Sequence, residues 1–446
     1  MPPRELPGFY WDETKERYFP LSSRPPGSPT TLPSNASLSS DISGQQRTRY
    51  RNEGPLKRRK VEFQQEPQPQ NVWSLVDRMR TGGTYTATGR YVHELELQSI
   101  ARPCRVEVNS VSDSNVLSFV ATEQADGSYT TTVGDQLGWV YTQYSAVPNV
   151  PTREVFLGSQ VNTVCCTQDI RVAIPFGAAC EVVIQNLTSP DVSMWTILRI
   201  LDKSCHDVRD AHLLDHSLLL GAAGRGILMP DIVASTHFRF LPTKSDVLSV
   251  YQLGQLCYTG CRNGSIQCFD RRVETVHKGQ ELFNQRFKGT NSSITHLSVV
   301  NEWQLLVSTI GGSLEMYDLR FAGNPGPIMQ FQGHSNRYTE KLGLAVSPAH
   351  DLLFAASDER RVNAWSLRTG NPIIPSVDPK QSPDSSLLAL VPLPKRCPRL
   401  LEEPFPAEIP AMQVTDGGSG EDRGLCVWVA SGKALYRYRI GKRPLF

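Results

Sequence analysis

The sequence lacks several features that mark common functional classes. Its 446 residues contain no uninterrupted apolar run near the roughly 20 residues that a membrane-spanning helix needs, and the start has no apolar segment of the kind that directs secretion. The 46 Lys and Arg residues nearly balance the 44 Asp and Glu residues, and a net charge of +2 disfavours a protein that binds nucleic acid through many phosphate contacts. None of the ten cysteines forms a Cys-x-x-Cys pair, which disfavours a zinc ribbon or a thioredoxin-like site. We therefore expect a soluble protein with reduced, partly buried thiols, no metal, no cofactor, no membrane partner and no direct nucleic-acid binding.

Patterns typical of enzymes are also missing. The glycine-rich run 221–226 has no strand–loop–helix context, so a turn between strands is favoured over a phosphate-binding loop. His212 and His216 are four residues apart among several aspartates, but a solvated loop is favoured over a metal site because no helix or third ligand is evident. No nucleophile elbow, catalytic triad spacing or pair of acid–base carboxylates is present. The sequence thus predicts a protein without catalytic activity of its own.

Residues 1–90 are predicted to be a mostly disordered head. The first 70 residues hold 11 of the 32 prolines and a long stretch rich in Ser, Thr and Pro, which cannot bury enough apolar surface to offset the entropy lost on ordering. An aromatic motif at 6–19 interrupts this head, and aromatic residues are common anchors in interfaces. Docking on a partner or on the folded domain and exposure to solvent are both open for its aromatic residues, which are Phe9, Tyr10, Trp11, Tyr18 and Phe19.

The head also contains a cluster of four consecutive basic residues. These are Lys57, Arg58, Arg59 and Lys60. Such a run is typical of a nuclear-import signal or of a solvated charge cluster, and we favour import because the surrounding residues should leave it accessible. The prediction is a protein of the nucleus, with the cytoplasm as a further location.

From residue 91 onward the sequence indicates an all-β domain. Short apolar runs alternate with Gly, Asn, Asp and Pro, without a long stretch of helical period. Three similar segments, 269–272, 317–320 and 365–368, recur at intervals of 48 residues, and each closes an alternating strand that follows another strand and a turn. Repeats of 40–50 residues are typical of propeller blades, which must stack and close into a ring to bury their faces. We predict a seven-bladed β-propeller over 91–446.

Details of this ring can also be predicted. The early blades are expected at about 103–142, 153–188 and 192–240, and a Pro-rich insertion at about 392–424. A strand from near His93–Gln98 is expected to close the ring, since a loose edge would leave backbone groups unpaired.

Two of the repeated strand ends carry an Asp-x-Arg sequence, which we call a box. The boxes are Asp270/Arg272 and Asp318/Arg320, on neighbouring blades. By the two-residue period of strands, both side chains of a box should emerge at the same rim, and arginine offers a planar set of donors suited to an interface. The simpler alternative is that each aspartate fixes its own turn while the arginine is solvated.

The chain resembles WD-repeat proteins, and among them the substrate receptors of cullin-4 RING ubiquitin ligases. Gly333-His334 followed by Trp365-Ser366 resembles one WD repeat, with Tyr317-Asp318 and Phe269-Asp270 as degenerate Trp-Asp endings. The paired boxes resemble the signature of those receptors, and further islands resemble the fourth-numbered group of the family in the same order. They are Leu6–Tyr10, Arg17–Phe19, His93–Leu95, Ser245–Leu248 and Gly260–Gly264.

This resemblance implies a set of partners and of site residues. The box arginines would bind the damage-binding adaptor protein, which joins the receptor to cullin-4 and its RING subunit, while another surface presents an unidentified protein client. Asp270, Arg272, Asp318 and Arg320 match the family's box, and Arg368 is a weaker match because Ser366 replaces the aspartate.

The same resemblance implies one structural network. His334, Ser357 and Trp365 match residues that form an internal hydrogen-bond network in WD repeats. Either Asp358 or Glu359 could supply the carboxylate of the adjoining turn.

Two other functions remain open from the sequence. One is a WD-repeat scaffold of another nuclear complex, in which the boxes serve only their own blades. The other is an enzyme or small-ligand binder that uses the central channel, which would need polar and titratable residues on the inner strands. The inner strands at 294–300 and 342–346 are mostly apolar, which favours a packed ring.

Overall fold

The computed structural model describes two parts of the chain, which are treated separately. The first is a hairpin formed by residues 9–12 and 17–20. The second runs from 103 to 440, and it comprises the ranges 103–124, 127–145, 151–188, 194–273, 279–283, 292–323, 326–347, 351–374, 400–417 and 424–440. The predictions for the basic cluster at 57–60 and for most of the head concern residues outside these ranges.

The aromatic motif forms a two-stranded antiparallel hairpin. Strand β1 (Phe9–Asp12) pairs with β2 (Arg17–Pro20), and the register places Tyr10 opposite Phe19 and Trp11 opposite Tyr18. A hairpin of two short strands is at best marginally stable alone in water. Whether this motif docks on a partner stays a prediction.

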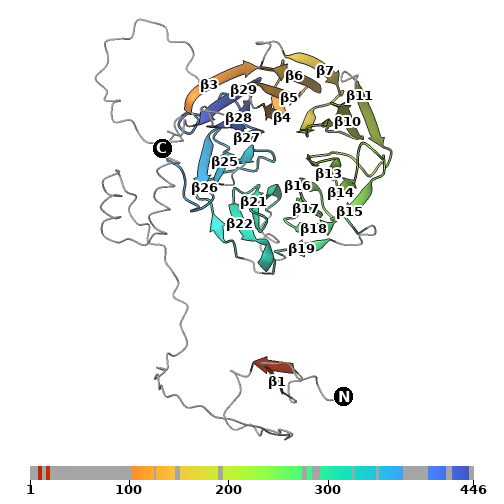
Figure 1. The fold of residues 1–446 in the computed structure, drawn as a ribbon, viewed down its shortest axis with the longest axis vertical. Helices are drawn as coiled ribbons and strands as arrows, with labels where there is room; N and C mark the ends of the chain where they lie inside the picture. Colours follow the sequence, from red (N-terminus) through yellow and green to blue (C-terminus); the bar gives the residue numbers. More distant parts are fainter. Residues whose placement is uncertain are drawn as a thin grey trace, which may run out of the picture. The chain divides into compact units, whose positions relative to one another are not determined.

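The second part consists of seven sheets, which we call blades 1 to 7 and which are arranged radially as a closed ring (Figure 1). In blades 1 to 3 the strands follow the sequence order from the first to the fourth. Their bounds are β4 (Val116–Glu123), β5 (Tyr129–Asp135), β6 (Trp139–Tyr144) and β7 (Thr152–Phe156); β8 (Val161–Cys166), β9 (Ile170–Pro175), β10 (Cys180–Asn186) and β11 (Trp195–Ile200); β12 (Asp210–Leu214), β13 (Ser217–Ala222), β14 (Arg225–Met229) and β15 (Arg239–Pro242).

Blades 4 to 6 continue the same order. Their bounds are β16 (Val247–Leu253), β17 (Leu256–Cys261), β18 (Ile266–Asp270) and β19 (Gln280–Leu282); β20 (Ile294–Val300), β21 (Gln304–Thr309), β22 (Leu314–Asp318) and β23 (Met329–Gln330); β24 (Leu344–Val346), β25 (Leu352–Ala356) and β26 (Val362–Ser366). The third strands β18, β22 and β26 end 48 residues apart, as the sequence repeat predicts. The predicted all-β fold with seven blades is confirmed.

Blade 7 closes the ring with a strand from the beginning of the domain. Strands β27 (Met412–Gly417), β28 (Gly424–Ser431) and β29 (Ala434–Ile440) are joined by β3 (Pro103–Ser110), which pairs with β29. Closure by an N-terminal strand is therefore confirmed, but the predicted position was wrong, since β3 takes the place expected for 93–98. Because β3 belongs to blade 7, blade 1 begins at β4, and the predicted early blades start too far toward the N-terminus.

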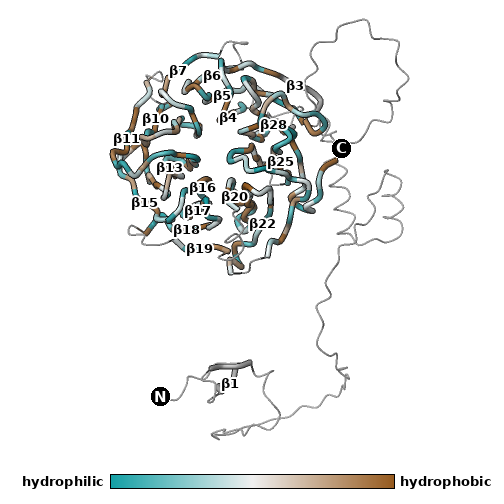
Figure 2. Tube along the Cα trace, turned by 180° about the vertical axis from the view of Figure 1, so that it is seen from behind, coloured by the Kyte–Doolittle hydropathy of each residue, from teal (hydrophilic) through white to brown (hydrophobic). Residues whose placement is uncertain are grey.

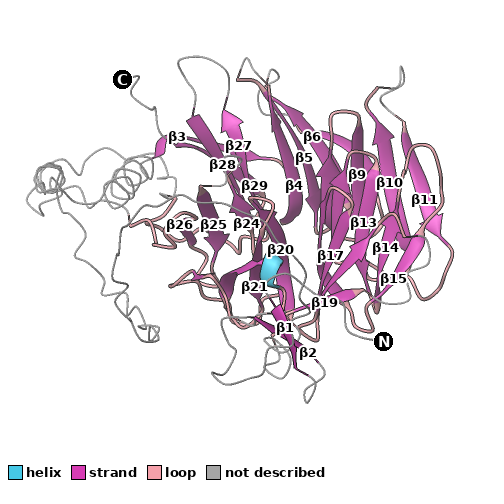
Figure 3. Cartoon of the chain, turned by 60° about the horizontal axis from the view of Figure 1, so that its bottom comes forward, coloured by secondary structure: helices cyan, strands magenta, loops and turns pink. Residues whose placement is uncertain are grey.

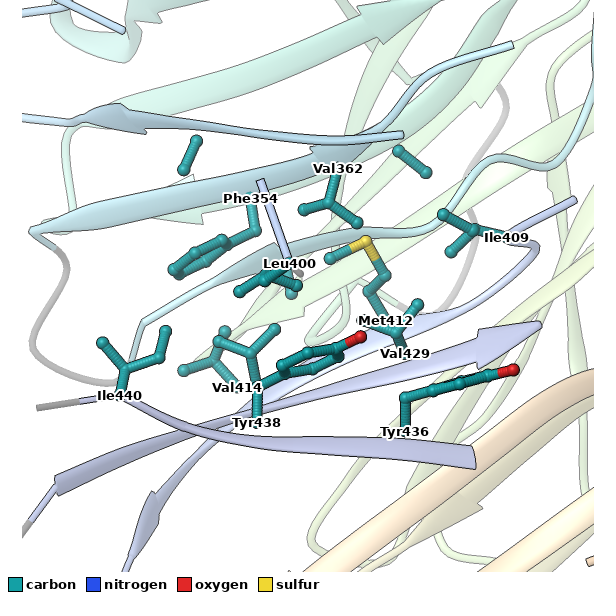
Figure 4. Close-up of a cluster of buried hydrophobic side chains, with 14 of the residues drawn as sticks. Phe354, Val362, Leu400, Ile409, Met412, Val414, Val429, Tyr436, Tyr438 and Ile440 are labelled. Atoms are coloured by element: carbon teal, nitrogen blue, oxygen red, sulfur yellow. The ribbon is translucent and has the colours of Figure 1, made fainter. Parts of the chain in front are cut away.

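The core lies in layers between neighbouring blades. The cluster between blades 6 and 7 includes Phe354, Val362 and Tyr438, which project into the space between the two sheets (Figure 4). Residues Leu400 and Ile409 are almost fully buried in the same layer, and β27 is the first strand of blade 7. The stretch expected as an insertion at 392–424 was therefore assigned wrongly for 400–417, because its prolines hid the apolar residues that pack between the blades.

Figure 2 shows hydrophobic and hydrophilic residues interspersed along the chain of the ring. Within the described ranges the structure has a single short helix of three residues, η2 (Leu319–Phe321), which follows β22 directly (Figure 3). No helix in the described part of the chain is long and apolar enough to cross a membrane.

Candidate functional site

The two boxes lie at the same end of neighbouring blades. Asp270 is the last residue of β18 and stands opposite Leu256, at the start of β17. Asp318 is the last residue of β22 and stands opposite Gln304, at the start of β21. Each box therefore adjoins the turn between the first and second strands of its blade. The turn between the second and third strands lies at the opposite end, which gives the ring one surface that carries both boxes.

Each box forms a fork between arginine and aspartate. Arg272 donates from Nε to Asp270 Oδ1 at 3.0 Å and from Nη2 to Oδ2 at 2.6 Å. Arg320 donates from Nε to Asp318 Oδ1 at 2.9 Å and from Nη2 to Oδ2 at 2.7 Å. The arginine side chains are nevertheless 71% and 57% exposed. The fork fixes the guanidinium plane and leaves further N–H donors directed away from the aspartate.

The forks remain charged over the whole physiological pH range. Hydrogen bonds from Arg272 lower the pKa of the Asp270 carboxyl to about 2, and the hydrogen bond from the Arg320 side chain lowers the pKa of Asp318 in the same way. The aspartates in turn raise the pKa of both guanidinium groups. This surface therefore presents two oriented cations whose charge does not depend on pH.

The aspartates have a structural function that recurs in other blades. In each box the carboxylate also accepts the backbone N–H of the arginine, at 2.9 Å. Blades 2, 3 and 6 place an equivalent acceptor at the same point, after the third strand. The acceptors are Asn186 for Thr188, Asp231 for Val233 and Ser366 for Arg368.

The comparison among blades distinguishes the role of the aspartate in a box from that of the arginine. Five consecutive blades use a polar side chain to cap this turn, so the aspartates are explained by the fold alone. The residue whose backbone N–H is capped varies among the blades: it is Thr188 in blade 2 and Val233 in blade 3, and an arginine in blades 4 to 6. Arginine at this position on blades 4, 5 and 6 therefore needs an explanation other than the turn.

Arg368 differs from the other two arginines. Arg368 is exposed, and its backbone N–H donates to Ser366 Oγ at 3.3 Å. No ion pair of its side chain is present among the described residues. Its guanidinium group is thus not held in a fork, which agrees with its being the weaker match to the family box.

Two exposed aromatic residues flank Arg320, and the sequence analysis missed both. The Arg320 Cζ atom lies 5.8 Å from the ring centroid of Trp303 and 5.9 Å from that of Phe321. These side chains are among the exposed large hydrophobic residues, at 52% and 62%. The available signal was positional, since Trp303 ends the turn that faces the box and Phe321 follows the box arginine.

The network predicted for His334, Ser357 and Trp365 was wrong. The Trp365 indole donates instead to the main-chain carbonyl of Gln332 at 2.8 Å, and Ser357 Oγ donates to the carbonyl of Arg361. His334 packs edge-on against Trp365, and neither of its ring nitrogens has a hydrogen-bond partner among the described residues. Burial lowers the pKa of His334 to about 4, so this ring is neutral and acts as a packing residue.

The turn carboxylate of this blade is Asp358. It accepts a hydrogen bond from Ser335 Oγ at 2.6 Å and forms an ion pair with Arg337 Nε at 3.0 Å. Glu359 lies beside it in the turn, and no hydrogen bond or ion pair of its side chain is present within the described ranges. The alternative that the sequence left open is therefore settled in favour of Asp358.

Polar residues gather at the start of the inner strands, contrary to the expectation of an apolar ring. The first strands of neighbouring blades lie against one another, so they form the inner wall. Lys341, from the loop before β24, donates to the carbonyl of Asn162 in blade 2, while Glu340 forms an ion pair with Arg209 at the start of blade 3. Blade 6 is not adjacent to blades 2 and 3, so this loop crosses the centre of the ring.

Two of the histidine and aspartate residues of this region lie in a strand and are half-buried, so the predicted solvated loop was wrong for Asp210 and His212, whereas His216 lies in the turn after that strand. Asp210 and His212 lie in β12, where Asp210 accepts the backbone N–H of Val250 at 2.9 Å. Burial raises the pKa of Asp210, lowers that of Lys341 and lowers that of His212 to about 4. Within the described ranges no group of three or more His, Cys, Asp or Glu side chains could hold a metal ion.

A buried ion pair connects blade 7 to blade 1. Arg437 donates from Nη2 to Glu123 Oε2 at 2.9 Å, and both side chains are at most 2% exposed. The Trp428 indole donates to Glu123 Oε1 at 3.1 Å, and Arg437 lies over the rings of Tyr129 and Trp428. This network joins residues 314 positions apart at the seam of the ring.

Comparison with known proteins confirms the fold. The crystal structure of the WD40 β-propeller domain of Doa1 superposes with a TM-score of 0.53 at 13% identity, over 77% of this chain and 97% of that one. The fold is a WD-repeat β-propeller. No family model matches the sequence.

Curated relatives share moderate similarity with part of the chain. DDB1- and CUL4-associated factor 4 is 30% identical over 168 residues in Bos taurus and 28% identical over 225 residues in Homo sapiens, and these matches cover 36% and 48% of this chain. WD repeat-containing protein 21 of Schizosaccharomyces pombe is 29% identical over 129 residues, or 28% of this chain. The matches cover 32%, 38% and 30% of the relatives, so the chain spans about a third of their length. These relatives support a WD-repeat protein similar to the DDB1- and CUL4-associated factors.

Proposed function

We propose that the protein is a substrate receptor of a cullin-4 RING ubiquitin ligase, in the group of DDB1- and CUL4-associated factor 4. The observation that carries this proposal is the pair of oriented, exposed guanidinium groups of Arg272 and Arg320 on neighbouring blades. The names of the similar bovine and human proteins, which associate them with DDB1 and cullin-4, point to the adaptor as the partner.

In this mechanism the protein brings a client close to the ligase, and the transfer of ubiquitin is catalysed by other subunits of the complex. The forked arginines would donate their remaining N–H groups to carboxylate or carbonyl oxygens of the adaptor, since guanidinium groups held in one plane lose little entropy on binding. The adaptor would then connect the receptor to cullin-4 and its RING subunit. A client bound elsewhere on the ring would be brought to the ubiquitin-charged enzyme.

The test measures capture of purified adaptor by the full chain and by Arg272→Ala/Arg320→Ala. The matched control is Arg262→Ala, because Arg262 is 67% exposed and ion-paired to Asp246 in the same blade, but lies in the turn at the opposite end. We expect the double variant to lose capture and the control to retain it, with unchanged circular dichroism for both.

The outcomes separate the proposal from its alternative. If the unaltered chain does not bind the adaptor, the ligase function is wrong and a scaffold of another complex takes its place. If the chain binds and the double variant binds equally well, the adaptor uses another surface. Localisation to the nucleus through residues 57–60 stays a separate prediction.

A further inference from the structure

On the surface that carries the boxes, one residue in the turn between the first and second strands can be compared among blades 2 to 6. Blade 5 has a different type of residue there from the other four blades. In blades 2 to 6, the residue after the capping side chain donates its backbone N–H to a carbonyl in the turn between the first and second strands. The residues that supply this carbonyl are Asp169, His216, Gln255, Trp303 and Asp351. Four of the five are polar or charged, and only blade 5 places a large apolar ring there.

The main chain of Trp303 is hydrogen-bonded to its box. Its carbonyl accepts the backbone N–H of Leu319 at 2.7 Å, within the box itself. The residues before it, Asn301 and Glu302, have positive φ angles of 49° and 62°, as is common in tight turns between antiparallel strands. The turn therefore places the main chain of Trp303 beside the box, and its ring centroid lies 5.8 Å from the Arg320 Cζ atom.

Phe321 shows the same departure on the other side of Arg320. The equivalent residue, one position after the box arginine, is Val273 in blade 4 and Thr369 in blade 6. In blade 5 this residue is a phenylalanine at the end of η2, and its ring lies within 6 Å of the same guanidinium group. The Arg320 guanidinium is thus bounded by a carboxylate and two aromatic rings, whereas among the described residues Arg272 is paired with its carboxylate and has no aromatic ring beside it.

We propose that Trp303, Arg320 and Phe321 form the centre of the surface that binds the adaptor, and that Arg272 lies toward its edge. This inference rests on the proposed function. Tryptophan and arginine are the residues most often found at the energetic centre of an interface, and exposed aromatic rings gain most when a partner removes them from water. The matching surface of the adaptor would be acidic and would contain an apolar recess wide enough for an indole ring.

The chemistry of this surface offers more than a simple charge contact. A purely electrostatic partner would be served equally by Arg272, which is more exposed than Arg320. The two rings add apolar area beside the cation, which a partner would remove from water together with the guanidinium group on binding. The expected binding is therefore less sensitive to salt than binding through the two arginines alone would be.

The test replaces each aromatic residue by the one that another blade uses at the same position. The variants are Trp303→Gln, as in blade 4, and Phe321→Thr, as in blade 6. Tyr338→Ala is the matched control, because Tyr338 is an aromatic residue with 76% exposure in a loop at the opposite end of the ring. Affinity for the purified adaptor is measured with the full chain, and unfolding midpoints confirm that each variant is folded.

We expect Trp303→Gln to weaken adaptor binding at least tenfold, Phe321→Thr to weaken it severalfold, and Tyr338→Ala to leave it within twofold. Trp303→Phe should recover part of the loss. If the chain binds, the double arginine variant binds poorly and Trp303→Gln binds normally, this inference is overturned while the proposed function stands. If the unaltered chain does not bind the adaptor at all, both are overturned.

Discussion

The seam between blades 7 and 1 and the boxes on blades 4 and 5 contain the same two functional groups in opposite surroundings. At the seam, Arg437 and Glu123 are buried, Glu123 also accepts a hydrogen bond from the Trp428 indole, and Arg437 lies over the Trp428 ring. At the boxes, Arg320 and Asp318 form a similar fork in which the arginine is mostly exposed.

Burial changes what an ion pair contributes to a protein. A buried pair is costly to desolvate, so it must be fully satisfied within the protein and has nothing left to offer a partner. An exposed pair contributes little to folding, so its geometry is free to serve recognition. The two regions should therefore respond to substitution in opposite ways.

The largest effect is expected at the seam. Arg437→Met should lower the free energy of unfolding by about 3–5 kcal/mol, because it leaves the Glu123 carboxylate buried without a counter-charge. Denaturant unfolding measures this loss. Glu123→Gln in the same chain should restore part of it, since the remaining polar group is neutral.

A matched control for the seam is Arg199→Met. Arg199 forms an ion pair with Glu181 at 2.7 Å but is 65% exposed, so its replacement should have little effect. Equal losses at Arg437 and Arg199 would contradict the distinction between buried and exposed pairs.

An intermediate effect is expected from acid in the interior of the ring. Burial lowers the pKa of both His212 and His296 to about 4, and His212 lowers that of His296 further. Because the unfolded chain binds protons with an ordinary histidine pKa near 6.5, stability is retained above about pH 6.5 and lost as the pH falls toward 4. The loss should reach about 2 kcal/mol per ring at pH 5.

This prediction is checked by unfolding at pH 7 and pH 5. The raised pKa of Asp210 acts in the opposite direction, so the informative quantity is the difference between the unaltered chain and His296→Gln. A folded variant should lose less stability between the two pH values. An identical pH dependence in both chains would show that His296 is not a source of acid sensitivity.

The smallest effect is expected at the box. Arg320→Ala should leave the midpoint of thermal unfolding unchanged, because Asp318 still caps the turn and begins η2. Asp318→Ala should lower the midpoint measurably, since the backbone N–H of residue 320 then loses its acceptor. A larger decrease for Arg320→Ala than for Asp318→Ala would mean that the arginine is part of the fold rather than of a binding surface.

Much of the fold could be predicted from the sequence because a blade is a local unit. Alternating side chains and regular turns define β18, β22 and β26 within a few residues, and the 48-residue spacing identifies the repeat. The boxes were visible for the same reason, since Asp and Arg two residues apart are neighbours at the end of a strand.

Other features could not be predicted because they depend on residues far apart in the chain. The role of β3 depends on its pairing with β29, and the burial of Leu400 and Ile409 depends on the gap between blades 6 and 7. The predicted hydrogen-bond network of His334 failed because the Trp365 indole meets a nearer acceptor, the carbonyl of Gln332.

The class of fold, the repeat and the two boxes follow from the amino-acid sequence alone, since all of these are set by residues that are close along the chain. Three features depend on the folded ring: which strand closes it, how the loop of Lys341 crosses its centre, and the position of Trp303 against Arg320. The physical reason is that packing brings together side chains whose spacing in the sequence carries no signal of contact. The sequence therefore predicts the arginines of the candidate site, and the fold adds the two aromatic rings that lie on either side of Arg320.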